Sequence, residues 1–249
     1  MPRSTAKRPP LSPAVREAFD HWKQGDLFDR LEASYRQLLD RRKRVVEFPG
    51  QHEPRKHTAS NCLVIQQTLL HRAERLIAAC GSMVLENNVY GLALIVRGHY
   101  ETTGVLGYLS NRLNSLEEGK IKFEEFAYNA ACAVLGAKHS QFAKAPNPPN
   151  ILTCIEKADS HLDTHYLKEK KGMLRDGYDW LSEFAHPNFC SNCAAFTIDK
   201  LNHRFVLKHD AEMQDRDFDL IAYLVISAGL FIWLFDDSTR RLTKNLLSR

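Results

Sequence analysis

The sequence predicts a mainly α protein, an irregular helical bundle with one small β-hairpin near residues 194–208. Two observations predict this fold class. Apolar residues recur at three- and four-residue steps through most of the 249 residues, as amphipathic helices require. Alternation of apolar and polar residues is confined to "AAFTIDKLNHRFVLK", where β-branched residues flank the turn-like "KLN".

The N-terminal part divides into a tail and a helical segment. Residues 1–12 contain three prolines and no helical pattern, so we expect a disordered basic tail. Residues 13–57 are expected to form an N-terminal helical segment and loop. Pro13 suits the first position of a helix with Ser12 as its N-cap. That helix is continuous, or it is two helices joined at "QGD".

Residues 58–249 are expected to form the main helical domain. Capping residues, glycines and prolines set the predicted boundaries of its helices. We predict helices from Thr58 or Ser60 with a break near Gly81, from 88 to 113, from 120 to 142, from Asn150 to Asp159, one or two within 167–186 broken at Gly172 or Gly177, and from 217 to 247.

The longest apolar run, residues 220–235, is interpreted as a buried core helix rather than a membrane span. As a helix it rises only about 24 Å, short of the roughly 30 Å hydrocarbon core of a bilayer. Aspartates flank it on both sides, and no apolar run follows the basic start of the chain. We therefore expect a cytoplasmic protein without a membrane partner, in which the six cysteines are free thiols.

The net charge of +4 is concentrated in residues 1–60, which hold 13 Lys and Arg against 8 Asp and Glu. A basic segment of this kind contacts nucleic acid or an acidic partner in some proteins. The alternative is a solvated tail and helix face without a partner.

The stretch "YDWLSEFAHPNF" at residues 178–189 contains the first candidate site. Asp179, Ser182 and His186 lie on one stripe of a helix, which Pro187 should end at His186. A histidine at a helix C-terminus, with a serine one turn away, could act as a general acid or base. The alternative is a C-cap, with Asn188 taking the left-handed turn.

The second candidate site is "LIVRGHYETTG" in the most apolar predicted helix. Arg97 follows a run of apolar residues, and Glu101 lies four residues further, on the same face. A guanidinium beside an apolar core needs a partner, so the two residues form either a structural ion pair or a site where Arg97 binds an anion such as phosphate.

Together these motifs resemble a known family. An apolar helix ending in Arg-x-x-x-Glu, followed by Leu-Ser-x-x-x-His-Pro, is similar to the uncharacterised helical proteins grouped as DUF5677, which resemble the broad HEPN class of nucleases and nucleotide-binding proteins. The resemblance covers roughly residues 60–240. It departs from the HEPN nuclease pattern because Glu101 stands four residues after Arg97, where those nucleases have histidine. The matching residues are Arg97, Glu101, Leu181, Ser182, His186 and Pro187.

The resemblance implies a homodimer that acts on RNA or a nucleotide, in a toxin or phage-defence setting, as a metal-independent ribonuclease without a cofactor. His186 would be the acid or base, Arg97 would bind phosphate, Glu101 would orient Arg97, and Ser182 would donate hydrogen bonds. Asn188 and Tyr178 would help Arg97 to bind substrate. Two alternatives remain. One is a zinc site at His186, Cys190, Cys193 and His203, which lacks the usual second close pair of ligands. The other is a non-catalytic helical interaction module in which the same residues are structural.

Overall fold

The computed structural model describes residues 11–47, 53–167, 171–187, 191–192, 195–209 and 213–247. Within them the protein is a helical bundle with a single two-stranded antiparallel hairpin, which confirms the predicted fold class. Asn188, Cys190 and Cys193, to which we assigned candidate roles, lie outside the described residues.

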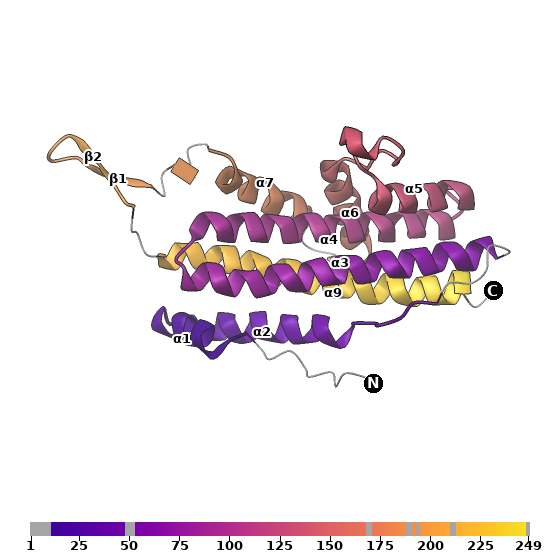
Figure 1. Ribbon diagram of the computed structural model, residues 1–249, viewed down its shortest axis with the longest axis horizontal. Coiled ribbons are helices and arrows are strands. Elements are labelled where there is room, and N and C mark those ends of the chain that lie inside the picture. The colour runs from indigo at the N-terminus through magenta and orange to yellow at the C-terminus, as the bar shows by residue number, and fades with distance from the viewer. Residues whose placement is uncertain are drawn as a thin grey trace.

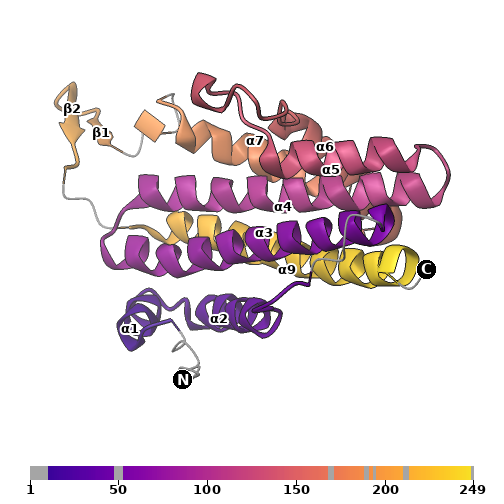
Figure 2. The ribbon, with the colours of Figure 1, turned by 45° about the vertical axis from the view of Figure 1, so that its right-hand side comes forward.

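Three long helices form the centre of the bundle, α3 (Pro54–Leu85), α4 (Val89–Glu117) and α9 (Phe218–Leu242). On one side α1 (Pro13–His21) and α2 (Gly25–Asp40) cover α3 and α9. On the other side α6 (Ile151–His165) and α7 (Met173–Ala185) cover α4, and α5 (Phe123–Leu135) lies along its C-terminal half (Figures 1 and 2). The bundle also contains the short 3₁₀ helices η1 (Ser140–Phe142) and η2 (Asp215–Asp217) and the π-helix η3 (Thr243–Leu247).

Helix α4 is central because it contacts helices on several sides. Two of its glycines let α6 approach closely: a Cβ atom at Gly107 would lie 2.3 Å from Cβ of Ala158, and one at Gly104 would lie 2.9 Å from Ile155. Glycine inside a helix costs about 1 kcal/mol relative to alanine, and here the close packing of α4 on α6 offsets that cost.

Helix α9 is long and apolar enough to cross a membrane by length and composition, but it packs as a core helix. Two thirds (67%) of its most apolar window is buried inside the bundle, against α2, α3 and α4. This agrees with the prediction of a buried helix for residues 220–235.

Several predicted boundaries are confirmed. Asn88 caps α4 by accepting from the Gly91 amide at 2.8 Å, and Asn150 caps α6 by accepting from the Leu152 amide. The first two helices are separate and meet at residues 22–24. The hairpin consists of β1 (Phe196–Asp199) and β2 (Arg204–Leu207), inside the predicted range.

Several predictions about helix ends were wrong. Helices α4 and α6 end at residues 117 and 165 rather than at 113 and 159. Helix α3 begins at Pro54 rather than at Thr58 or Ser60, and it continues through Gly81 without a break. Gly81 lies where α1 crosses, and its Cβ would sit 3.0 Å from Val15, so packing stabilises the helix there. Helix α5 ends at residue 135 and not at 142, because the chain turns and the Ala137 amide bonds the Pro146 carbonyl.

The expected tail also ends earlier than predicted. Leu11, which we placed in a disordered tail, is buried in the core beside Val15 and Phe19. Residues 1–10 lie outside the described residues. Helices α1 and α2 therefore belong to the same core as α3, α4 and α9.

The buried cysteines behave as small apolar residues. Cys62, Cys80, Cys132 and Cys154 are free thiols, as expected. Burial raises the pKa of the Cys62, Cys80 and Cys154 thiols to about 12, so they stay protonated at neutral pH.

Candidate functional site

Arg97 lies where α4 meets α7. Its Nη2 donates a hydrogen bond to the Tyr178 hydroxyl at 2.9 Å, and its Cζ lies 5.1 Å from the centre of the Tyr178 ring. Its Nε lies 3.4 Å from Oε1 of Glu101, one turn further along α4. The structure thus brings together three of the predicted site residues, which we call the α4–α7 seam: Arg97, Glu101 and Tyr178.

The Arg97–Glu101 ion pair is loose. The Arg97 Nε is buried and makes no hydrogen bond to any described residue, although the Glu101 carboxylate is nearby. The two side chains are 22% and 31% exposed. The guanidinium is therefore held mainly by Tyr178, which fixes α7 against α4.

Ser182 lies one turn after Tyr178 on the same helix. Its hydroxyl donates to the Tyr178 carbonyl at 2.8 Å, a bond within its own helix. Asp179, predicted to share a stripe with it, is paired with Arg175 at 2.7 Å. Ser182 thus adjoins the α4–α7 seam, but its hydroxyl proton is already donated to a backbone carbonyl of α7.

His186 ends α7 as predicted. It has an extended backbone ahead of Pro187, its amide donates to the Ser182 carbonyl, and its carbonyl accepts from the Ser191 hydroxyl at 2.6 Å. The imidazole is exposed and contacts no described residue through a hydrogen bond or ion pair. His186 follows Tyr178 by eight residues, which is about 12 Å along the helix axis.

Helix α7 owes its start to a residue that the sequence analysis missed. The buried carboxylate of Asp159, on α6, accepts from the amides of Leu174 and Arg175 at 2.9 and 2.8 Å. Burial raises the pKa of Asp159, and these two backbone bonds oppose that rise. An N-cap supplied by another helix has no local sequence signal, so only the assembled bundle identifies it.

A buried polar cluster on the opposite face of α4 was also missed. His99 is fully buried, with its Nδ1 2.9 Å from the Ser227 hydroxyl on α9, which in turn lies 2.9 Å from the Thr103 hydroxyl. Burial, with the field of the Arg72 guanidinium, lowers the pKa of His99 to about 3. The imidazole is thus neutral and belongs to the packing of α4 on α9.

A third cluster joins α4, α6 and α9. Arg241 bridges Glu117 of α4 and Asp237 of its own helix, at 2.5 and 3.2 Å. The buried His161 lies 3.6 Å from the Asp237 carboxylate, too far for a hydrogen bond. Burial alone would raise the pKa of Asp237, but the nearby His161 and the hydrogen bonds from Arg240 and Arg241 hold it well below the usual range. The four-residue spacing of Asp237 and Arg241 is the one signal in the sequence that could have indicated this cluster.

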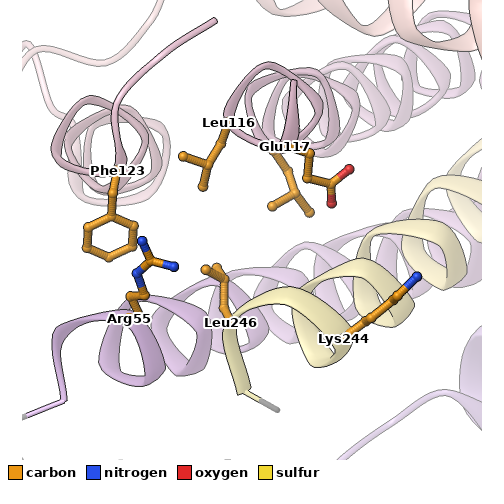
Figure 3. Close-up of a pocket in the computed structure, with 7 residues that line it drawn as sticks. Arg55, Leu116, Glu117, Phe123, Lys244 and Leu246 are labelled. Atoms are coloured by element: carbon orange, nitrogen blue, oxygen red, sulfur yellow. The ribbon is translucent and has the colours of Figure 1, made fainter. Parts of the chain in front are cut away.

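A pocket of about 410 Å³ lies next to this third cluster, where α5, the start of α3 and the end of the chain meet (Figure 3). The Arg55 guanidinium lies over the Phe123 ring, 5.6 Å from its centre. Glu117 lies twenty residues along α4 from Arg97, about 30 Å, so the pocket is separate from the α4–α7 seam. Its lining consists of Arg55, Leu113, Leu116, Glu117, Phe123, Lys244 and Leu246.

No described residues form a metal site: within the described ranges there is no group of three or more His, Cys, Asp or Glu side chains that could hold an ion. His203, the conceivable fourth zinc ligand, sits in the hairpin turn with a φ of 50°. The zinc alternative depends on Cys190 and Cys193, which lie outside the described residues.

Comparison with known proteins adds no assignment. No family model, no curated protein and no solved structure matches this chain.

Proposed function

We propose that this protein is a non-catalytic helical interaction module, in which the residues of the α4–α7 seam are structural. One observation carries the proposal: the Arg97 guanidinium contacts the Tyr178 hydroxyl, the Tyr178 ring and the Glu101 carboxylate. A guanidinium that is already held by these two residues would have to leave them before it could neutralise a phosphate.

The position of His186 supports the same proposal. A general acid or base must come within hydrogen-bond reach of the proton that it transfers, either directly or through one water. Tyr178, which holds Arg97, is about 12 Å along α7 from His186. The imidazole of His186 is exposed and its backbone ends α7, so a role as a helix C-cap is favoured over a role as general acid or base.

The second candidate function is metal-independent cleavage of RNA, which rests on the resemblance to DUF5677 and HEPN proteins. It is favoured by one observation: Arg97, Glu101, Tyr178 and Ser182 come from two helices and gather along a single seam, where the Arg97 side chain keeps 22% of its surface exposed. In that function His186 would move the proton, and Arg97 would stabilise the charge that develops on the phosphate.

Incubation of the purified full-length protein with total RNA, with and without a chelator, separates the two functions. The interaction module predicts no cleavage above that of a sample without protein. Cleavage that resists the chelator, yields cyclic phosphate ends and is lost in both Arg97→Ala and His186→Ala would replace the module with the nuclease. Arg175→Ala is the matched control, because it removes an arginine from the exposed face of α7.

A further inference from the structure

The β-hairpin extends from the bundle as an arm (Figures 1 and 2). β1 and β2 pair with each other, and in the described part of the chain no helix packs extensively on either strand. A lone two-stranded hairpin is at best marginally stable in water. We therefore expect the arm to be stabilised by a surface that packs against it.

The two faces of the arm differ in character. Side chains alternate between faces along a strand, and the pairing of Phe196 with Leu207 and of Ile198 with Phe205 places all four on one face. The rings of Phe196 and Phe205 meet edge to face, 5.2 Å apart. The opposite face carries Thr197, Asp199, Arg204 and Val206.

The apolar face of the arm is open to solvent. Ile198, Phe205 and Leu207 are 58%, 69% and 61% exposed, and Leu201 at the turn is 92% exposed. A contiguous group of large apolar side chains on an exposed surface marks an interaction site. Most charges of the arm are positive: Lys200 lies at the turn, and Arg204 and Lys208 lie on the opposite face, against Asp199, which already accepts from Arg204 and Asn202.

The end of the bundle next to the arm carries the opposite charge beside a second exposed apolar group. The bond from the Met213 amide to the Asn87 side chain holds the chain that leads into α9 against the α3–α4 turn. Three exposed carboxylates stand there, Glu86, Asp215 and Asp219, and a fourth, Asp217, already accepts from the Gln214 amide and lies near Arg216. The apolar side chains are Leu85 at the end of α3 and Tyr90 and Leu94 at the start of α4, which are 46%, 46% and 56% exposed. The Tyr90 hydroxyl donates to the Ser191 carbonyl at 2.8 Å, so its ring is the part that remains open. We call these three side chains the acceptor surface.

We propose that two copies of this protein exchange arms, so that the apolar face of each hairpin covers the acceptor surface of the other. The apolar face of the arm matches the apolar acceptor surface, and Lys200 at the turn of the arm suits the carboxylates beside that surface. A contact that is repeated reciprocally about a twofold axis closes into a dimer. The partner is a second copy because the complementary surface is on the chain itself.

The area involved agrees with a stable dimer. A large apolar side chain that is about half exposed offers roughly 100 Å². Four exposed side chains of the arm and three of the acceptor surface give roughly 700 Å² on each copy, within the range of a standard protein interface. Two hairpins packed only on each other would bury roughly 400 Å² on each copy, so exchange onto the bundle is favoured.

The acceptor surface continues towards the α4–α7 seam. Tyr90, Leu94, Arg97 and Glu101 recur at three- and four-residue steps, on one face of α4. A docked arm would therefore lie beside Arg97 of the other copy. Arm exchange goes beyond the proposed function, because it does not depend on whether the α4–α7 seam is catalytic. The mass of the protein in solution tests arm exchange, and incubation with RNA tests the proposed function, so either can be disproved without the other.

The test is the mass of the full-length protein in solution, measured by analytical ultracentrifugation over a range of concentrations. We expect a dimer for the parent protein. Phe205→Asp should weaken dimerisation at least 10-fold by placing a charge in the apolar face of the arm. Val206→Asp is the matched control, because it makes the same change on the opposite face of the same strand and should leave the dimer intact.

The acceptor surface is tested by Leu94→Asp, with Leu135→Asp at an exposed position of α5 as its control. Leu94→Asp alone should also dissociate the dimer. A 1:1 mixture of Phe205→Asp and Leu94→Asp should recover part of the association, because one intact arm then meets one intact acceptor surface. Circular dichroism of each variant would show that the helices remain folded.

Three results would overturn the proposal. The first is a parent protein that stays monomeric at every concentration, including a monomer whose arm instead binds single-stranded RNA or anionic lipid vesicles. The second is a Phe205→Asp variant that dimerises as the parent does. The third is a dimer that Phe205→Asp dissociates and Leu94→Asp leaves intact, since that pattern indicates hairpin-to-hairpin packing.

Discussion

Arg97 and His99 stand two residues apart on α4 but face opposite sides of the helix. His99 faces α9, is completely buried and contacts the Ser227 hydroxyl. Arg97 faces α7, keeps part of its surface exposed and binds Tyr178. The comparison teaches that a polar residue in an apolar helix is not by itself a functional signal. The element packed against each face decides whether the residue is sealed into the core or remains accessible to a ligand.

The largest loss of stability is expected from a substitution on the face of α4 that is buried against α9. His99→Ala should lower the free energy of unfolding by about 3 kcal/mol, because it leaves a cavity between α4 and α9 and removes a partner of Ser227. Urea unfolding would measure the change. Leu135→Ala, at an exposed position of α5, is the control and should cost less than about 1 kcal/mol. Equal losses from the two variants would show that the burial of His99 between α4 and α9 adds no stability beyond that of an exposed side chain.

The next effect concerns pH and the same buried imidazole. The pKa of His99 is about 3 in the folded protein, against 6.5 for an ordinary histidine. Between these values the unfolded chain binds one more proton at this site. The neutral His99 therefore makes its full contribution to the free energy of unfolding above pH 6.5. That contribution falls by about 1.4 kcal/mol per pH unit as the pH is lowered towards 3.

Thermal or urea unfolding of the parent and of His99→Gln, at several pH values, isolates this contribution. Other groups titrate in both proteins, so the informative quantity is the difference between the two stabilities. That difference should change with pH below 6.5. A constant difference would mean that His99 takes up its proton as readily in the folded state as in the unfolded state.

A smaller effect is expected at the α4–α7 seam. Glu101→Gln should lower the free energy of unfolding by about 1 kcal/mol, because it weakens the pairing of a guanidinium that is only partly screened by solvent. Thermal melts of the two proteins would measure it. An unchanged melting temperature would indicate that Arg97 does not need Glu101 in the free protein and remains available to an anion.

The smallest effect is expected at His186. His186→Ala should change the free energy of unfolding by less than about 0.5 kcal/mol, because the exposed imidazole has no partner among the described residues and the backbone cap remains. Urea unfolding would check this value. A loss above 1 kcal/mol would mean that the side chain, and not only the backbone, holds the end of α7.

The sequence by itself determined the features that depend on near neighbours. Proline at position 13, asparagine at 88 and 150, and proline at 187 set helix ends, because capping and the restriction of φ involve atoms only a few residues apart. The alternation in residues 194–208 gave the hairpin for the same reason. The Arg97–Glu101 pair was predictable too, since four residues make one turn of a helix.

Only the tertiary structure decided which residues meet across the bundle. The contact of Arg97 with Tyr178 spans 81 residues, and that of His99 with Ser227 spans 128. Whether Gly81 breaks its helix likewise depended on the approach of α1, and the start of α7 depended on a carboxylate from α6. Such contacts depend on how whole helices pack, because the energy gained from burial at a helix interface exceeds the local preference of any one residue.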